Sequence, residues 1–545
     1  MRRSRIIILL LILGLFHAPA TAQTAVDSTV SAAETEAFRQ LESGLENLRR
    51  QLGIPGMAAA VVHNRRLVWG RGFGYADLEN GIPATLETPW HIASVAKTLV
   101  AVMILQLAEE GRLSPDDPLE KYGIHLAARG TVRLRHLLSH TSEGVPGAFF
   151  RYSGARWENL ATVLRAASGS TVKEAVTERI IGRLALANTA ANRESLTEAC
   201  PREDVLRRAA AFYRLGPDHR PVRMERALGF YAAGGLFSSA RDMALYDAAI
   251  DGDVLLKPGS KQLMWTPAVS PGGRRLPHGL GWFSQSVGDT RLVWHFGWHP
   301  DHASAFYLKV PDRHLAFIVC ANTDGLSQPF CLHRGNALDS PAALLFLRTC
   351  VFRGRVPAEI VEKERVAADV VLKAGGHKRI LGSVERVVVL VCLCGFVTAV
   401  LLWPIAWVAG IIGRRPGRPG HRAGPGLSRA LALIAALACL FIHLGLTKAP
   451  FLIYWPEFPG WFDGVSPAEN LFIMLPTLVA LLGVALVGMA CLAWIRSCWS
   501  LSARIHYSAV TGCTVVYASL LHHWHLVSPA YYWSYMVRPL LGAGP

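Results

Sequence analysis

The part of the chain up to residue 380 contains two kinds of hydrophobic pattern. Apolar residues recur at helical spacing over residues 33–52, and a second such pattern predicts a largely buried helix over residues 94–110. Between them, the strand-like runs 58–62 and 67–75 flank a polar four-residue turn, which is typical of a β-hairpin. We therefore expect a helix, a hairpin and a buried helix in this order.

The next patterns complete one domain. Residues 115–260 are expected to be mostly helical with long loops, whereas residues 292–295, 304–310 and 315–321 have the pattern of strands. A helix over residues 342–352 is expected to end the domain. This order predicts an α/β sandwich in which helices flank an antiparallel sheet built from both ends of the domain, with a mostly helical insert between them.

Four longer apolar segments follow, over residues 387–413, 430–446, 471–495 and 505–527. Each is near the length that a helix needs to cross a bilayer. Charge is distributed accordingly, because residues 23–380 contain 43 Lys/Arg and 36 Asp/Glu whereas residues 381–545 contain only 10 and 4. We therefore predict a domain of four transmembrane helices over residues 381–545 and expect the lipid bilayer to be a partner of the chain.

The N-terminal segment has the pattern of an export signal. Arg2, Arg3 and Arg5 precede an apolar run that is too short to span a bilayer, and a small-residue cleavage site ends at Ala22. An uncleaved anchor is the alternative, and it also leads the following residues out of the cytoplasm. We expect a signal peptide over residues 1–22 and an exported domain over residues 23–380.

Charges in the predicted loops agree with export. The loops after the first and third apolar segments contain arginines and no acid, so the positive-inside rule assigns both to the cytoplasm. These arginines are Arg414, Arg415, Arg418, Arg422 and Arg429 in one loop, and Arg496 and Arg504 in the other. The sequence thus predicts a multi-pass protein of the bacterial inner membrane whose first domain lies on the periplasmic side.

Composition excludes other classes of function. The formal net charge of +16 is spread over the chain without the dense basic stripe of a nucleic-acid-binding protein. Six of the ten cysteines lie in or beside the apolar segments, where a thiol behaves as a small apolar group. The pairing of the other four, Cys200, Cys320, Cys331 and Cys350, stays open, and protein partners are not specified by the sequence.

The segment Ser94-Val95-Ala96-Lys97 has the residues of an activated nucleophile. Residues three apart share a helical face, so the Lys97 amine can reach the Ser94 hydroxyl. The N-terminus of a helix offers unpaired N–H groups and a positive dipole end, which stabilise an oxyanion and lower the pKa of a nearby lysine. A neutral lysine can then activate the serine. An N-cap serine with a solvated lysine is the alternative, but Lys97 lies among apolar residues and needs a polar partner.

Two further segments could complete a site. Tyr152 lies in a loop just before a helical run, where its phenol could relay the serine proton. His295-Phe296-Gly297 ends a predicted strand, and a glycine there lets a substrate backbone approach the strand edge. Taken alone, each segment is better explained by a structural role.

Together these segments resemble the penicillin-recognising serine hydrolases, which include class C β-lactamases, D-Ala-D-Ala carboxypeptidases, esterases and D-amino-acid peptidases. The resemblance covers about residues 33–350 and includes residues 136–142, 233–236 and 279–282. It implies that Ser94 is the acylated nucleophile, Lys97 its proton partner and Tyr152 the general base and acid. It also implies that His295 stands where the family has a lysine or histidine, and that the backbone N–H groups of Ser94 and Trp298 form the oxyanion hole.

Two positions depart from the family's usual pattern. Gly154 replaces an asparagine, which removes an amide that orients the lysine and the substrate carbonyl. Phe296 replaces a threonine or serine, which removes a hydroxyl. Both losses concern substrate binding, for which we expect Gly154, Gly297 and Trp298. The substrate is therefore expected to be a small-molecule or peptide-like amide or ester, with neither a β-lactam nor a D-Ala-D-Ala peptide specified.

Two alternatives were weighed against this hydrolase. His295, His299, Asp301 and His302 are residue types that bind metals, but the glycine and proline among them disfavour a helical two-histidine site, so we expect no metal and no cofactor. The other alternative is a catalytically weak penicillin-binding or cell-wall-ligand sensor that signals through its transmembrane helices. The intact Ser94, Lys97 and Tyr152 favour the enzyme, whereas Gly154 and Phe296 favour the sensor.

Overall fold

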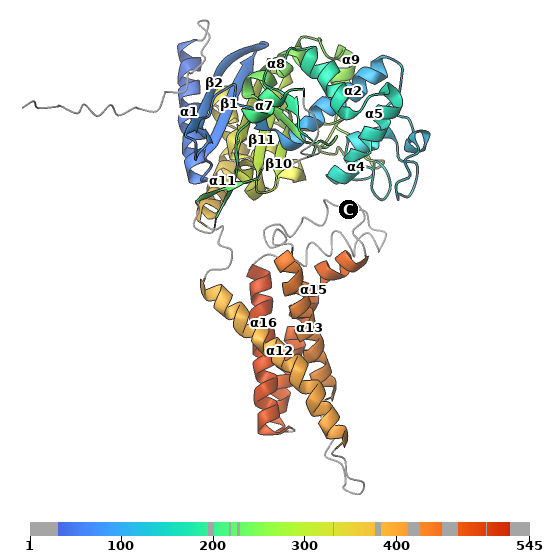
Figure 1. The fold of residues 1–545 in the computed structure, drawn as a ribbon, viewed down its shortest axis with the longest axis vertical. Coiled ribbons are helices and arrows are strands. Elements are labelled where there is room, and N and C mark those ends of the chain that lie inside the picture. The colour runs from blue at the N-terminus through green and yellow to red at the C-terminus, as the bar shows by residue number, and fades with distance from the viewer. Residues whose placement is uncertain are drawn as a thin grey trace, which may run out of the picture. The chain divides into compact units, whose positions relative to one another are not determined.

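The structure is a computed structural model that describes residues 31–193, 201–216, 220–225, 229–330, 332–376, 383–412, 426–448, 467–497 and 499–523. It divides into two compact units, the first reaching Lys378 and the second beginning at Arg379, with Arg151–Arg156 grouped with the second (Figure 1). The predicted signal peptide, residues 1–22, lies outside the described residues, as do most of the predicted membrane loops.

A seven-stranded antiparallel sheet is the framework of the first unit, with strand order β3-β2-β1-β12-β11-β10-β9. The strands are β1 (Gly56–His63), β2 (Arg66–Asp77), β3 (Ile82–Pro83), β9 (Phe283–Val287), β10 (Thr290–His299), β11 (Ala303–Val310) and β12 (Leu315–Ala321). The pairing of β1 with β12, in which Ala60 faces Ile318, joins the two ends of the domain as expected. The prediction missed the short edge strands β3 and β9.

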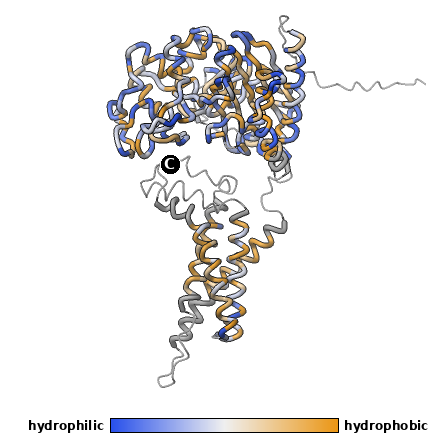
Figure 2. The backbone as a smooth tube through the Cα atoms, turned by 180° about the vertical axis from the view of Figure 1, so that it is seen from behind, coloured by the Kyte–Doolittle hydropathy of each residue, from blue (hydrophilic) through white to orange (hydrophobic). Residues whose placement is uncertain are grey.

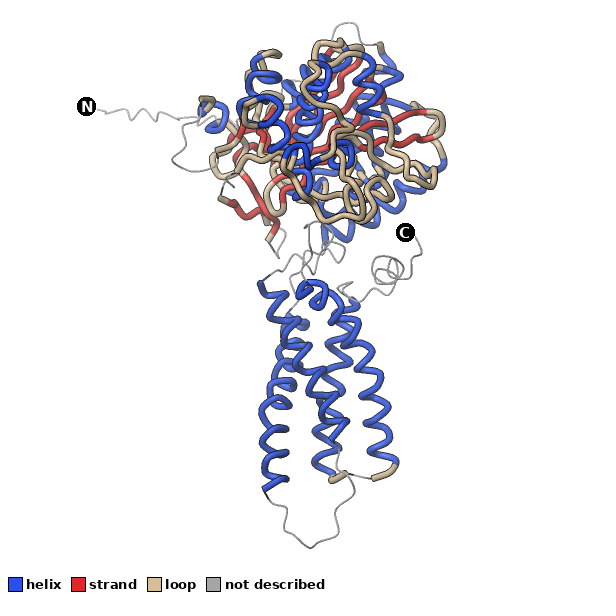
Figure 3. Tube along the Cα trace, turned by 90° about the vertical axis from the view of Figure 1, so that its right-hand side faces the viewer, coloured by secondary structure: helices blue, strands red, loops and turns tan. Residues whose placement is uncertain are grey.

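Helices cover both faces of this sheet (Figure 3). On one face, α1 (Ala32–Gln51) packs with α10 (Pro341–Phe346) and α11 (Ala358–Gly376). The ring of Phe317 on β12 stacks on Phe346 of α10, whereas its neighbour Ile318 joins the core cluster on the other face. Adjacent residues of a strand point to opposite faces of the sheet, so Phe317 and Ile318 face the two different helical layers. The predicted α/β sandwich with an antiparallel sheet is confirmed.

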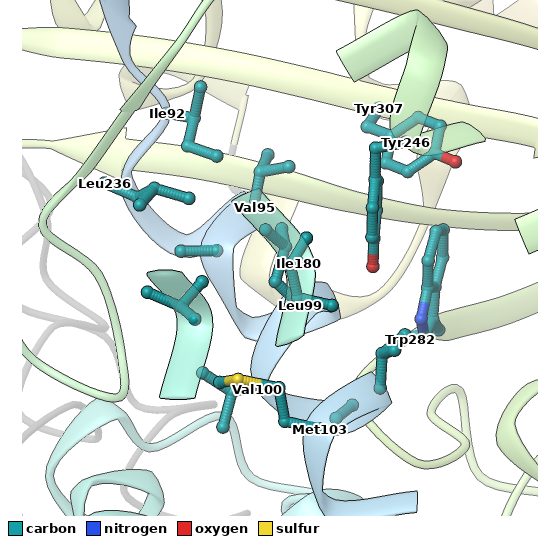
Figure 4. Close-up of a cluster of buried hydrophobic side chains, with 14 of the residues drawn as sticks. Ile92, Val95, Leu99, Val100, Met103, Ile180, Leu236, Tyr246, Trp282 and Tyr307 are labelled. Atoms are coloured by element: carbon teal, nitrogen blue, oxygen red, sulfur yellow. The ribbon is translucent and has the colours of Figure 1, made fainter. Parts of the chain in front are cut away.

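The other face is covered by α8 (Ala240–Asp251), and residues of α2 (Ala96–Glu109) belong to the core cluster on this face. Every residue of α2 from Ala96 to Leu107 is buried, which confirms the predicted buried helix. Val95, Leu99 and Met103 pack among the rings of Trp282 and Tyr307 and other apolar side chains (Figure 4). The N-terminus of α2 is therefore held within a rigid core.

The insert between the two halves of the sheet is only partly helical. Its short helices are α3 (Leu134–Leu138), α4 (Gly154–Glu158), α5 (Leu160–Ser168), α6 (Val172–Val176), α7 (Glu203–Arg207) and, after α8, α9 (Pro258–Trp265). It also contains a hairpin, β6 (Phe212–Leu215) with β7 (Pro221–Met224), and a small sheet of β4 (Trp90–His91), β8 (Leu236–Ser238) and β5 (Ala190–Ala191). The prediction that residues 115–260 are mostly helical was correct for the helices. It was wrong for β5, β6, β7 and β8, because strands of two to four residues are too short to give a clear alternation.

After residue 378, the described part of the second unit contains four helices: α12 (Ser383–Ile412), α13 (Gly426–Lys448), α15 (Pro467–Ile495) and α16 (Leu501–His523). They coincide with the four predicted apolar segments and are coloured as hydrophobic over much of their length (Figure 2). Within the described residues, only Leu475–Ile495 is both long and apolar enough to cross a membrane; Val387–Leu401 and Ala430–Leu444 are shorter apolar stretches.

Candidate active site

Ser94 lies in a strained turn between the small sheet and α2. The turn is a 3-10 helix, Ala93–Val95, in which Ala93 adopts a φ of +46°, a conformation that costs energy for a residue with a Cβ. A backbone hydrogen bond of 2.9 Å from Ile92 N–H to the Leu236 carbonyl anchors the turn. The core described above holds the helix that follows. The backbone of Ser94 is therefore held in place by the fold before any substrate binds.

Lys97 is directed back at this serine, as the spacing predicted. Its Nζ lies 2.9 Å from Ser94 Oγ and donates a 2.8 Å hydrogen bond to the Ala233 carbonyl, and only 1% of the residue is exposed. Burial lowers the pKa of Lys97 to about 7, because the low-dielectric surroundings disfavour the ammonium form, although the charge of Glu158 acts in the opposite direction. A large fraction of Lys97 is therefore a neutral amine at neutral pH.

The Ala233 carbonyl that holds Lys97 belongs to a segment fixed by a residue that the sequence analysis missed. The Glu158 carboxylate accepts hydrogen bonds of 3.2 Å from both the Ala232 and the Ala233 N–H groups. Trp157 Nε1 donates a 3.1 Å bond to the Ala232 carbonyl, and the Trp157 ring lies 5.8 Å from Lys97 Nζ. The only sequence signal for Glu158 was its position near the start of the helical run predicted over residues 157–167, after Tyr152.

His295 is fully buried on β10 as a neutral imidazole. Its Nδ1–H donates a 2.7 Å hydrogen bond to the Phe296 carbonyl, which assigns the proton to Nδ1 because a carbonyl only accepts. Burial holds the pKa of His295 well below its usual value, and the charges of Lys97 and His278 act in the same direction. The His278 ring, 6.1 Å away, was also missed. Since His295 is not a cation, it cannot supply the positive charge of a lysine at this position.

The structure explains the glycine at position 297 differently from the sequence prediction. A Cβ at this position would lie 2.2 Å from the Ile92 carbonyl oxygen, so the glycine lets β10 approach the turn that carries Ser94. Ser327 Oγ donates a 2.8 Å bond to the Gly297 carbonyl and fixes this part of the strand. Trp298 follows, opposite Ser304 in the sheet. The oxyanion hole formed by the N–H groups of Ser94 and Trp298 stays a prediction.

Tyr152 and Gly154 lie at the entrance to α4. Tyr152 is buried two residues before the helix, and its placement against Ser94 stays a prediction from the sequence. Gly154 begins the helix with a negative φ, and a Cβ there would meet no atom of the described residues within 4 Å. A Cβ is therefore sterically tolerated at the position where the usual asparagine is missing.

The histidines near the end of β10 pack against one another. The rings of His299 and His302 are 4.5 Å apart, and His91, on β4, lies 4.9 Å from His299. Burial lowers the pKa of His299 to about 4, with the charge of His302 acting in the same direction. Across the described residues, no group of three or more His, Cys, Asp or Glu is arranged to hold a metal ion.

The chain is similar in sequence to several known proteins. The chain is 25% identical over 265 residues to "Putative penicillin-binding protein PbpX" of Bacillus subtilis (strain 168), which is 44% of this chain and 64% of that protein. It is 35% identical over 113 residues to human "Serine beta-lactamase-like protein LACTB, mitochondrial", 19% of this chain and 21% of that one. These matches thus span less than two thirds of either relative.

Among solved structures, the octameric penicillin-binding protein homologue from Pyrococcus abyssi is similar, at 23% identity and a TM-score of 0.49, over 57% of this chain and 77% of that one. Residues 38–340, more than half of the chain, match the Beta-lactamase family, and this range contains Ser94, Lys97 and His295. The chain therefore belongs to the Beta-lactamase family of penicillin-recognising serine hydrolases.

Proposed function

We propose that this protein is a membrane-anchored, extracytoplasmic serine hydrolase that cleaves an amide or ester through an acyl-enzyme at Ser94. The observation that carries the proposal is the 2.9 Å separation of Lys97 Nζ and Ser94 Oγ at the start of a buried helix. A neutral lysine beside a fixed serine is an activated nucleophile. The matching of residues 38–340 to the Beta-lactamase family supports the same chemistry.

We propose the following reaction at this site. Ser94 Oγ attacks the substrate carbonyl while its proton passes to Lys97 Nζ, and the N–H groups of Ser94 and Trp298 are proposed to stabilise the oxyanion. The carbon–nitrogen or carbon–oxygen bond then breaks, and we assign to Tyr152 the proton that the leaving group takes up. The proton that Lys97 accepted from Ser94 then passes to Tyr152, which restores both residues. Water hydrolyses the resulting ester of Ser94, releasing the acid and restoring the serine.

The membrane part of the proposal rests on the second unit. Its helices expose apolar side chains at Leu390, Leu444 and Val484, the last 74% exposed, whereas small residues such as Ala435 are buried between helices. Apolar residues outside and small residues between helices are typical of membrane bundles. Together with the predicted export signal and the loop arginines, this supports four spans with the hydrolase outside the cytoplasm.

Reporter fusions test this topology. Fusions after residue 380 and at Trp461 are expected to be active outside the cytoplasm, and fusions at Gly420 and Ser500 inside it, because the arginines flank the last two positions. Alkaline phosphatase and green fluorescent protein fusions report the two sides. A fusion at the C-terminus that reports the cytoplasm would show that the chain has an odd number of spans, and the histidine-rich last segment would be the first to re-examine.

Substrate preference provides a further prediction. Gly154 and Phe296 lack polar groups that would hold a β-lactam or peptide carboxylate, and a site without such partners discriminates less against small esters. We expect short-chain aryl esters to be hydrolysed about tenfold faster than penicillins or cephalosporins, as measured by kcat/KM. Gly154→Asn, whose Cβ would meet no described atom within 4 Å, should shift this ratio toward amides. Cephalosporin turnover equal to that of the best ester would contradict this preference.

A sensor is the competing function, and turnover separates it from the enzyme. A fluorophosphonate or fluorescent penicillin should label the protein in either case, because both need only a reactive Ser94. The hydrolase releases product repeatedly when incubated with aryl esters and D-amino-acid amides, whereas a sensor stops after one equivalent. The relatives described as penicillin-binding proteins make fluorescent penicillin a reasonable first probe.

A further inference from the structure

Glu158 is the last residue of α4 and lies beside the peptide that holds Lys97. Its two carboxylate oxygens accept from two successive backbone groups, Oε1 from Ala232 N–H and Oε2 from Ala233 N–H, each at 3.2 Å. The carbonyl of the same Ala233 accepts the 2.8 Å bond from Lys97 Nζ. A continuous chain of contacts therefore runs from Glu158 through one residue to the amine beside the nucleophile.

We propose that Glu158 is a positioning residue whose carboxylate clamps the Ala232–Ala233 backbone, so that the Ala233 carbonyl orients Lys97 toward Ser94, and whose charge controls how readily Lys97 releases its proton. The inference rests on the proposed function, since it assigns Lys97 the role of accepting the Ser94 proton. Glu158 does not touch the substrate in this account and acts only through Lys97.

The orientation of the Lys97 amine follows from the number of its N–H groups and lone pairs when it is neutral. Lys97 Nζ then has two N–H groups and one lone pair. When one N–H is committed to the Ala233 carbonyl, rotation about the last side-chain bond is restricted, and the lone pair can be aimed at the Ser94 hydroxyl 2.9 Å away. A mobile Ala233 carbonyl would let the amine rotate away, and the clamp by Glu158 prevents this. Gly154, at the start of the same helix, has no side chain that could share this role.

The negative charge of Glu158 has a second effect, which is to raise the pKa of Lys97. Burial lowers the pKa of Lys97 and raises that of Glu158, and the attraction between the two groups partly offsets both shifts. The pKa of Lys97 is thus higher with the Glu158 carboxylate nearby than burial alone would make it. Removing the negative charge should lower the pKa of Lys97, so that its basic form persists to more acidic pH.

The test compares the pH dependence of kcat/KM for an aryl ester in the full-length protein and three variants. Glu158→Gln removes the charge and one of the two acceptors, Glu158→Asp keeps the charge, and Glu120→Gln removes a charge from an exposed surface position as the matched control. We expect the acidic midpoint, near pH 7 in the natural protein, to fall by about 0.5–1 pH unit in Glu158→Gln and the plateau to fall about threefold to tenfold. Glu158→Asp should retain the natural midpoint, and Glu120→Gln should match the natural protein.

A second measurement keeps the inference independent of activity. The 15N shift of Lys97 Nζ, assigned by its loss in Lys97→Met, reports protonation even if no ester is turned over. A midpoint that moves to lower pH in Glu158→Gln supports the clamp, and failure to hydrolyse any substrate would then count only against the proposed function. An unchanged or higher midpoint, or an equal shift in Glu120→Gln, overturns the inference. Thermal unfolding of each variant identifies any that fail to fold. If Glu158→Gln is one of them, Glu158→Asn, which also removes the charge, carries the test in the same 15N titration.

Discussion

Ser94→Ala is expected to lower hydrolysis of every substrate by about 10⁴-fold or more and to abolish covalent labelling by fluorophosphonates. The reason is chemical, because no acyl-enzyme can form without Oγ, and Lys97 would then have no hydroxyl to deprotonate. The measurement is kcat/KM for an aryl ester together with in-gel detection of the probe.

The same substitution should leave the fold intact. The Ser94 side chain is small, and its contact with Lys97 is replaceable by a water molecule, so we expect the free energy of unfolding to change by less than about 1 kcal/mol. Equal melting temperatures for the natural protein and Ser94→Ala would show that lost activity reflects lost chemistry. Activity retained in a well-folded Ser94→Ala protein would refute the assignment of the nucleophile.

Lys97→Met is expected to have the second-largest effect, a loss of about 10³-fold in the rate of labelling at Ser94. Methionine fills a similar volume but offers neither a donor nor a base. In the natural protein the basic form of Lys97 disappears as the pH falls through the pKa of about 7, so kcat/KM should drop tenfold per pH unit below that value. The residual activity of Lys97→Met should lack this dependence.

A measurement of stability separates the role of Lys97 as a base from a structural role. Lys97 is buried, and an apolar residue of similar size avoids the cost of burying an amine, although it leaves the Ala233 carbonyl without this donor. We therefore expect Lys97→Met to unfold at the same or a higher temperature despite its low activity. The control is Lys121→Met, which removes the half-exposed ion pair of Lys121 with Asp117. It should change neither the rate of labelling at Ser94 nor the melting temperature. If Lys97→Met melts many degrees lower, lost activity reports lost structure instead.

The elements with a strong hydrophobic periodicity could be predicted from the sequence. The helix over residues 94–110, the hairpin and the strands beginning at residues 304 and 315 are present with bounds close to those predicted, because long apolar runs are decided by burial. The β6–β7 hairpin was missed because its strands have four residues each and carry Arg214 and Arg223, which disguise the alternation. The edge strand β9 was missed for a similar reason, since its inner residues are Ser-Gln-Ser.

The local part of the site was predictable and the distant part was not. Ser94 and Lys97 are three residues apart on one helix, so their contact follows from helical geometry. Glu158 meets Ala232 and Ala233 across more than seventy residues of insert, and no periodicity encodes such a contact. The neutral state of His295 likewise depends on burial and on nearby Lys97 and His278, which only the folded chain brings together.

Peptide mapping by mass spectrometry after reaction of the full-length protein with a fluorophosphonate tests the central claim most directly. The account predicts one modified peptide, with the added mass on Ser94, and none in Ser94→Ala. The rate of this modification should rise as the pH is raised through about 7, as Lys97 loses its proton. Modification of a different residue, or hydrolysis that continues while Ser94 stays unmodified, would contradict the account.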